Sequence, residues 1–271
     1  MLSILNSISS LTAEDALSKT QAALQKTLTE LSTGLKINSG SDDAAGLAIA
    51  NGLLGNISAL TQSSQNASDG IGLLQTADGA LSQVTSLLNR AVTLATEASN
   101  GGLSPSQATA LDTEYQSILA EISNIGSTTN FNGSAIFGTT ASVFTSDGTG
   151  TGSSTIATTI GALTTAALAL AGTNLTSTAT AQTALADVST AITTVAANRG
   201  AIGASVNQLS ASSNVENTEV VNLTSAENSI ENADIGQTVA QMTQYNVLQQ
   251  TGMAALSQSN QAQQSVLKLL Q

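Results

Sequence analysis

The sequence predicts a mainly α-helical fold: a long antiparallel helical bundle or coiled coil with paired N- and C-terminal helices and a small β-hairpin or loop region in the middle. Two observations predict it. Apolar residues recur at alternating steps of three and four residues over both ends of the chain, which is the spacing of helix seams. Residues 127 to about 180 are instead rich in Thr, Ser, Gly and Ala. Terminal helices with a single apolar stripe are unstable alone in water, so they must pair with each other or with another copy.

The first predicted helix carries a seam made of Leu17, Gln21, Leu24, Leu28, Leu31 and Leu35. This helix is expected to end in the glycine-containing region 34–40. Ser39, Ser41, Asp42 and Asp43 follow, and their oxygens can accept hydrogen bonds from the free N–H groups of a helix start. They therefore predict the start of the second helix. The alternative is that Asp42 and Asp43 form a carboxylate pair for metal binding or acid–base chemistry.

The second seam is the longest and consists of Ala50, Leu53, Ile57, Leu60, Ser64, Ala67, Ile71, Leu74, Asp78, Leu81, Thr85, Leu88, Val92 and Ala95. A helix over this stretch would be about 70 Å long, which suits a coiled coil or a rod better than a globular core. Asn100-Gly101-Gly102 is expected to end it, with glycine in the left-handed conformation of a C-cap. Pro105 after Ser104 then marks the first turn of a shorter helix, which is expected to end near Gly126.

The middle of the chain predicts a loop or a small β element. Asn132-Gly133 and Asp147-Gly148 are hairpin-turn dipeptides, and residues 135–137 and 143–144 are short strand candidates. Residues 162–171 are a candidate for one short helix.

Helical seams return in the C-terminal part of the chain. The first of them consists of Leu185, Val188, Ile192, Val195, Arg199, Ile202, Val206, Leu209, Ser213, Glu216, Val220, Leu223, Glu227 and Ile230. The last consists of Ile235, Val239, Met242, Met253, Leu256, Leu267 and Leu270. Asp78, Arg199, Glu216 and Glu227 occupy seam positions, where polar groups can select one alignment of the helices or contact another subunit. The alternative is that the helices rotate and expose them.

Composition excludes several classes of function. The chain has no Cys and no His, which removes the usual ligands of zinc and copper and leaves only a carboxylate-based active site as an enzymatic alternative. Six basic and eighteen acidic residues give a net charge of −12, which disfavours binding to nucleic acid or anionic lipid. The longest apolar runs, such as residues 166–171, fall far short of the roughly 20 residues that a bilayer requires. No basic residue precedes Lys19, so the N-terminus does not predict a cleaved secretory signal.

Motifs at both ends of the chain carry a family resemblance. Residues 31–50 resemble the N-terminal signature of bacterial flagellins, and the similarity continues through residues 65–71, 75–81 and 129–133. Residues 231–234, 248–252, 260–261 and 266–270 resemble the C-terminal signature. Together the similarity covers residues 1–138 and 183–271.

The resemblance implies a non-enzymatic structural subunit of the extracellular flagellar filament, which serves swimming motility. It implies an inner coiled-coil domain of residues 1–42 and 234–271, a rod-like helical domain of 43–138 and 183–233, and a short variable, surface-exposed segment, 139–182. The terminal seams are then assembly residues: Leu17, Leu24, Leu28, Leu31, Leu35, Ile235, Val239, Met242, Met253, Leu256, Leu267 and Leu270. No cofactor, metal, nucleic acid or membrane is implied.

The partners that the resemblance implies are other copies of the chain, a flagellar export chaperone, and the filament cap and hook-junction proteins, reached by secretion through the flagellar type III export channel. Arg90, Leu94 and Glu114 match positions that Toll-like receptors contact in some relatives, and Leu94 is expected to face outward because it lies off the seam. The alternatives are a hook–filament junction subunit, and a secreted helical adhesin or translocator.

The chain departs from the family pattern at four positions. An arginine common in relatives is Lys36 here, and Thr238, Gln244 and Gln263 replace an acid, an arginine and a proline. Arginine and lysine are not equivalent where a bidentate pair is made. Ion pairs of the inner domain in relatives are therefore expected to be missing here, with amide hydrogen bonds in their place.

Overall fold

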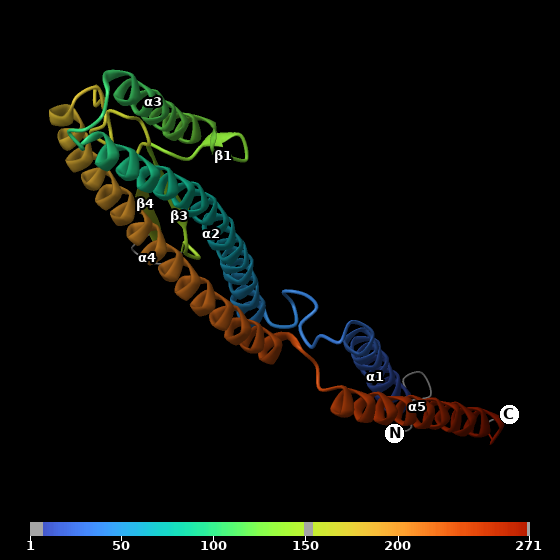
Figure 1. Cartoon of the computed structure of the whole chain (residues 1–271). Helices are drawn as coiled ribbons and strands as arrows, with labels where there is room; N and C mark the ends of the chain where they lie inside the picture. Colours follow the sequence, from blue (N-terminus) through green and yellow to red (C-terminus); the bar gives the residue numbers. More distant parts are fainter. Residues whose placement is uncertain (1–7, 149–153, 270–271) are drawn as a thin grey trace. The chain divides into compact units, whose positions relative to one another are not determined.

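A computed structural model describes residues 8–148 and 154–269, and the fold is mainly α, as the sequence predicts. Five helices and four short strands follow one another along the chain (Figure 1): α1 (Ile8–Thr33), α2 (Ala44–Ala98), α3 (Pro105–Thr128), β1 (Asn130–Phe131), β2 (Ser134–Ala135), β3 (Thr139–Phe144), β4 (Thr155–Ile160), α4 (Thr178–Glu231) and α5 (Ile235–Leu269). The chain divides into two compact units. We call Met1–Gly55 with Asn222–Gln271 the terminal unit, and Asn56–Val221 the central unit.

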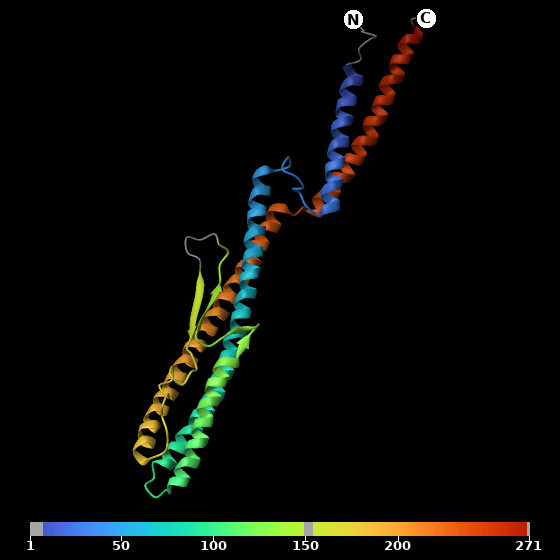
Figure 2. The same cartoon turned by 90° about the horizontal axis from the view of Figure 1, so that it is seen from above.

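In the terminal unit, α1 and α5 lie side by side and run antiparallel (Figures 1 and 2). Gly34 ends α1 with a left-handed φ of +76°, and its N–H donates to the carbonyl of Glu30 at 2.8 Å, which is the conformation that favours glycine after a helix. The connectors that leave α1 and enter α5 then pair. Leu35 and Asn232 form an antiparallel bridge, and the N–H of Lys36 donates to the carbonyl of Glu231 at 2.7 Å.

The start of α2 follows the sequence prediction at Asp43 and departs from it at Asp42. Asp43 Oδ1 accepts from the N–H groups of Ala45 (3.1 Å) and Gly46 (2.9 Å), so Asp43 caps the helix. Asp42 instead accepts from the backbone N–H groups of Asn38 (3.2 Å) and Ser39 (3.1 Å) in the preceding loop. Both carboxylates thus serve the local backbone.

The turn between α2 and α3 corrects one expectation. Neither Gly101 nor Gly102 adopts a left-handed φ. The helix instead tightens at its end, because the N–H of Asn100 donates to the carbonyl of Glu97 three residues earlier at 3.1 Å, and this satisfies a terminal carbonyl without glycine. The start of α3 is as predicted: Ser104 and Gln107 form a reciprocal capping box, and proline stands in the first turn.

The core of the central unit is shared by α2, α3, α4 and the segment that joins β4 to α4. Its buried members run from Ala67 to Leu209 along the chain, and Tyr115, Leu74, Leu81 and Leu88 are among the largest. Helices α2 and α4 run antiparallel, since contacts join Ser64 to Ser213 and Asp78 to Arg199, so that the partner's residue number falls along α4 as the number rises along α2. Figures 1 and 2 show α3 alongside the later part of α2.

The segment 139–182 differs from the sequence prediction of an exposed stretch with one short helix. Residues 162–171 form turns and no α-helix, and Ala169 has a positive φ of 56°. Apolar side chains of the segment are almost fully buried in the core: Ile156, Ile160, Leu163, Leu168, Leu170 and Leu175. These side chains belong to the same core as buried residues of α2, α3 and α4. The segment therefore covers apolar surface of the helices, and this contact buries its own apolar side chains.

Two hairpins precede this segment. Asn132 (φ 50°) and Gly133 (φ 79°) form the turn between β1 and β2, as their sequence predicts. The second hairpin pairs β3 with β4 from Thr139 opposite Ile160 to Phe144 opposite Thr155. It packs close to α2: a Cβ built on Gly70 would lie 2.5 Å from Val143 Cγ2, so only glycine fits there without a shift.

Helix α2 differs from the expectation that no segment is suited to span a membrane. Helix α2 is long and apolar enough to cross a bilayer by length and composition alone, with a mean hydropathy of 1.3 in its most apolar window, although no single apolar run is long. Only 17% of that window is buried within the subunit. The exposed part includes Ile49 and Leu54, so α2 offers apolar surface that the single chain leaves uncovered.

Candidate assembly interface

The α1–α5 seam is built from side chains at alternating three- and four-residue steps. On α1 the half-buried or buried positions at these steps are Ser10, Ala13, Leu17, Thr20, Leu24, Thr27 and Leu31, and Ala23 and Glu30 beside them are also half-buried. On α5 they are Thr238, Met242, Tyr245, Gln249, Gly252, Leu256 and Ser259, and Gln241 and Asn246 beside them are also half-buried. Each helix therefore presents a continuous stripe to the other, as in an antiparallel coiled coil.

This stripe agrees with the predicted seam at every second position. At the positions between, the residue that faces the partner helix is the one before the predicted residue. Leu17, Leu24 and Leu31 lie in the stripe, but Thr20 and Thr27 take the places expected for Gln21 and Leu28. The α5 stripe is displaced in the same way. The predicted residues that it includes are Met242 and Leu256, while Ile235, Val239 and Met253 are exposed in the single chain.

Two predicted seam residues cannot be placed in this way: the side chain of Leu267 and all of Leu270 lie outside the described residues. Leu35 is half-buried, and its backbone forms the bridge to Asn232.

The seam itself buries little apolar surface. Thr27 and Thr238 are 3% and 5% exposed, and each hydroxyl donates to the carbonyl four residues earlier in the chain. Gly252 faces Leu17, since a Cβ at Gly252 would lie 3.3 Å from Leu17 Cδ1. Small and hydroxyl side chains let the helices approach each other but contribute little hydrophobic stabilisation. Among the described residues, the buried apolar side chains of the terminal unit are Ile37 and Ala50.

Large apolar side chains of the terminal unit lie outside instead. Ten of the thirteen exposed large hydrophobic side chains in the described ranges belong to it: Ile8, Leu11, Leu28, Ile49, Leu54, Ile235, Val239, Val247, Leu248 and Met253. Their exposed fractions lie between 40% and 76%. Exposed apolar surface that is concentrated in one part of a molecule marks an interaction site.

The basic side chains are already used within the chain. The five whose side chains the structure describes each contact an acceptor of the same chain: Lys19–Asp15 (2.7 Å), Lys26–Asp42 (2.8 Å), Lys36 with the carbonyl of Ser229 (3.1 Å), Arg90–Glu114 (2.7 Å) and Arg199–Asp78 (2.7 Å). Acidic residues outnumber basic ones by twelve. A new ion pair between copies that used one of these five side chains would therefore compete with a contact that it already makes.

Asp42 joins α1 to the loop before α2 in the terminal unit. Its carboxylate accepts a hydrogen bond from the Lys26 ammonium of α1, from the Ser39 hydroxyl, and from the N–H groups of Asn38 and Ser39. These donors, Lys26 first among them, lower the pKa of Asp42 from 3.8 to about 2. In turn, the hydrogen bond to Asp42 raises the pKa of Lys26.

Lys36 makes no ion pair among the described residues. Its ammonium donates to the carbonyl of Ser229 in the last turn of α4, where helix carbonyls are unsatisfied and attract a positive charge. Thr238, where the family resemblance leads us to expect an acid, donates to the carbonyl of Asp234.

Three of the four polar residues at seam positions have side-chain partners between α2 and α4. Arg199 of α4 binds Asp78 of α2 through two hydrogen bonds, Nε to Oδ1 at 2.7 Å and Nη2 to Oδ2 at 3.2 Å. Glu216 is only 4% exposed and accepts from the hydroxyl of Ser63 at 2.9 Å. The alternative of an exposing helix rotation is therefore wrong for Glu216. Glu227 is half-buried.

The three residues considered for receptor recognition do not share one surface. Arg90 and Glu114 are about half exposed and pair with each other between α2 and α3. Leu94 is fully buried, so the prediction that it faces outward is wrong. The reason is that α2 is covered on two sides near its C-terminal end, where Ala91, Leu94 and Ala95 all enter the core.

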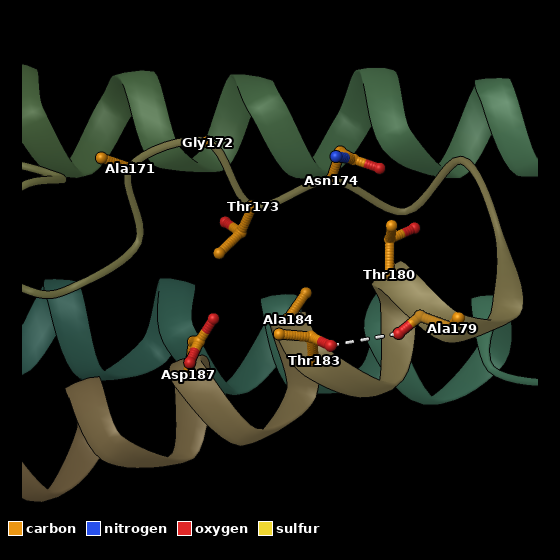
Figure 3. A pocket seen from close by; sticks show the side chains of 9 residues that line it. All are labelled: Ala171, Gly172, Thr173, Asn174, Ala179, Thr180, Thr183, Ala184 and Asp187. Carbon is orange, nitrogen blue, oxygen red and sulfur yellow. Dashed lines mark hydrogen bonds between the residues drawn. The ribbon is translucent and has the colours of Figure 1, made fainter.

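A hollow of about 360 Å³ lies between the loop 171–174 and the start of α4 (Figure 3). Its lining consists of Ala171, Gly172, Thr173, Asn174, Ala179, Thr180, Thr183, Ala184 and Asp187. Asp187 is its one charged side chain, and the hydroxyl of Thr183 donates to the carbonyl of Ala179 at 3.2 Å. Within residues 8–148 and 154–269, no group of three acidic side chains could hold a metal ion. The exposed apolar side chains of the terminal unit are thus the most distinctive candidate site.

Comparison with known proteins finds family matches in both helical parts of the chain. Residues 4–142 match the bacterial flagellin N-terminal helical region, and residues 185–270 match the bacterial flagellin C-terminal helical region. A flagellin of Halalkalibacterium halodurans is 35% identical over 249 residues, which cover 91% of each chain. A flagellin of Listeria monocytogenes is 31% identical over 285 residues, which cover 97% of each chain.

Among solved structures, the crystal structure of Bacillus cereus flagellin is similar, with a TM-score of 0.50 and 31% sequence identity. The similarity covers 56% of the present chain and 88% of the Bacillus cereus chain.

Proposed function

The chain belongs to the bacterial flagellin family, and from that premise we infer that it is the structural subunit that polymerises into the extracellular flagellar filament. Polymerisation proceeds by pairing and packing of the terminal helices, and the filament serves swimming motility. The family is one of structural proteins, and a non-enzymatic role is part of the proposal.

One observation carries the assembly mechanism: the terminal unit exposes large apolar side chains and buries almost none. Ten such side chains of its described residues lie on its surface, whereas the central unit holds a continuous core from Ala67 to Leu209. Covering a fully exposed Leu or Ile contributes about 1.5–3 kcal/mol. Contact with neighbouring copies supplies that burial, and the helices α1 and α5 gain their stability from the polymer.

The domain organisation that we propose follows the family. Residues 1–42 and 234–271 form the inner coiled-coil domain, and residues 43–138 and 183–233 form the rod-like domain. The pairing of α1 with α5, and the shared core of α2, α3 and α4, support this division. The buried side chains of the segment 139–182 support its inclusion in the rod-like domain as a hairpin and a covering loop.

The predicted assembly residues fall into two groups in this proposal. Leu17, Leu24, Leu31, Met242 and Leu256 hold α1 against α5 within one subunit, because they lie in the stripe that the two helices share. Leu28, Ile235, Val239 and Met253 contact neighbouring subunits, because they remain 40–49% exposed.

We further propose that the subunit leaves the cell unfolded through the flagellar export channel, without a cleaved signal, and meets an export chaperone, hook-junction proteins and the filament cap on its way. The absence of disulfides and the near absence of aromatic residues, 2% of the chain, are compatible with threading through a narrow channel. Accumulation of the chain in a strain without the export apparatus, and its recovery in the medium of the intact strain, would test this route.

Recognition by a Toll-like receptor is a narrower proposal and rests on the family position of Arg90 and Glu114. The exposed ion pair between them supports it, since a receptor could contact both side chains on one face of the central unit. Leu94 is excluded from the proposed contact because it lies in the core. Receptor activation by an Arg90→Ala variant, compared with the native subunit, tests it.

The experiment for the main proposal is electron microscopy of the dissociated full chain after addition of short filament seeds and salt. Long uniform filaments are expected from the full chain. Chains that lack residues 1–42 or residues 234–271 are expected to form none, because half of the α1–α5 pair is then missing. Soluble monomers or short capped assemblies from the full chain would instead favour a hook–filament junction subunit.

A further inference from the structure

We propose that two sets of buried or half-buried polar residues between α2 and α4 fix the axial register of these helices, at a cost in stability. The first set, the polar layer, consists of Ser63, Ser64, Ser212, Ser213 and Glu216. The second set, the ionic tie, is the pair Asp78–Arg199. The proposal does not depend on the polymerisation of the chain.

The register needs a specific device because the apolar seams of α2 and α4 repeat. Both seams repeat mostly branched apolar residues at three- and four-residue steps, so sliding one helix by seven residues brings similar side chains into contact. The displacement would be about 10 Å, which is seven residues at 1.5 Å each. Apolar packing alone therefore distinguishes these alignments poorly.

The polar residues do distinguish them. Ser64 Oγ lies 2.9 Å from Ser213 Oγ, and Arg199 binds Asp78 through two hydrogen bonds. The two sets are separated by 14 residues on each helix, 64 to 78 on α2 and 199 to 213 on α4, so both are satisfied in the same alignment. A slide by seven residues would break both, and would place Asp78 opposite the apolar positions that flank Arg199 in the α4 seam.

Glu216 shows the cost of this arrangement. Its Oε1 accepts from Ser63 Oγ at 2.9 Å and from Ser212 Oγ at 3.2 Å. Its Oε2 is buried and has no hydrogen-bond partner among the described residues. No basic side chain of the described residues contacts it. A buried carboxylate that is only partly satisfied destabilises a fold relative to an apolar residue of similar size. Its place in the interface is explained by selection of the alignment, a documented role of buried polar residues in coiled coils.

The test uses distance measurements between spin labels in the dissociated full chain. The sequence has no cysteine, so Asn89→Cys and Asn214→Cys, both at exposed positions, supply the only labelling sites. Because these positions are far apart along the helix axis in the observed alignment, a slide by seven residues changes their separation by nearly the full 10 Å or so.

Three variants of the labelled chain are compared. Ser63→Ala with Glu216→Leu removes the polar layer, Asp78→Leu with Arg199→Leu removes the ionic tie, and the third variant combines all four changes. Ser68→Ala with Glu219→Leu is the matched control, since it makes the same kinds of change at exposed positions of the same helices.

We expect one narrow distance in the native chain, in the control and in either single-set variant, and a second distance about 10 Å away in the combined variant. The polar-layer variant is also expected to unfold at a higher urea concentration than the native chain, and helicity by circular dichroism confirms that all variants are folded. One unchanged distance in the combined variant would overturn the proposal. A lower urea midpoint for the polar-layer variant would overturn the claim that the layer is kept at a cost.

Discussion

Leu28 provides the sharpest test of how the terminal helices contribute to assembly. It is 46% exposed on α1, beside the stripe that faces α5, and we assign it to the contact with neighbouring subunits. Burying a fully exposed leucine contributes about 1.5–3 kcal/mol, so covering the remaining half contributes about 0.7–1.4 kcal/mol per subunit. Leu28→Ala is expected to remove most of this contribution.

At about 1.4 kcal/mol for each tenfold change in an equilibrium constant, the critical concentration for filament growth should rise roughly three- to tenfold. The measurement is the concentration of soluble subunit that remains after seeded polymerisation and sedimentation. Thr155→Ala, at an exposed position of β4, is the control and should leave this concentration unchanged. An unchanged critical concentration for Leu28→Ala as well would refute the assignment of this face to subunit contacts.

Three other predictions follow from the charges, the glycines and the loop before α2. Sodium chloride should lower the critical concentration, because subunits of net charge −12 repel each other and salt screens this repulsion; a rise with salt would indicate ion pairs between copies. Gly70→Ala should destabilise the subunit by about 1–3 kcal/mol in urea unfolding, because the new methyl group meets Val143, whereas Gly79→Ala, with open space around it, should be neutral or stabilising. Asp42→Asn should lower the urea midpoint at neutral pH. Because folding lowers the pKa of Asp42 from 3.8 to about 2, the difference should persist above pH 3.8 and vanish as the pH falls toward 2; a difference independent of pH would contradict the role of the charge.

The helices and their local signals could be predicted from the sequence because they depend on nearby residues. The seam of α2, the cap at Asp43, the capping box at Ser104 and the turn at Asn132-Gly133 all follow from side chains within a few positions of one another. Strand β4 was missed, although Ile156, Thr158 and Ile160 alternate with exposed residues as in a half-buried strand.

The face that each helix presents to its neighbours was decided by the tertiary structure alone. The heptad pattern of α1 marks a broad stripe, but only the approach of α5, with Gly252 against Leu17, determines that Thr27 lies inside and Leu28 outside. Leu94 is buried because a third helix and a returning loop cover α2, and no periodicity within α2 reports that cover. Sequence by itself determined the helical ends, the charge and the family, since these are properties of neighbouring residues and motifs. Burial depends on segments distant in the chain, so it required the fold.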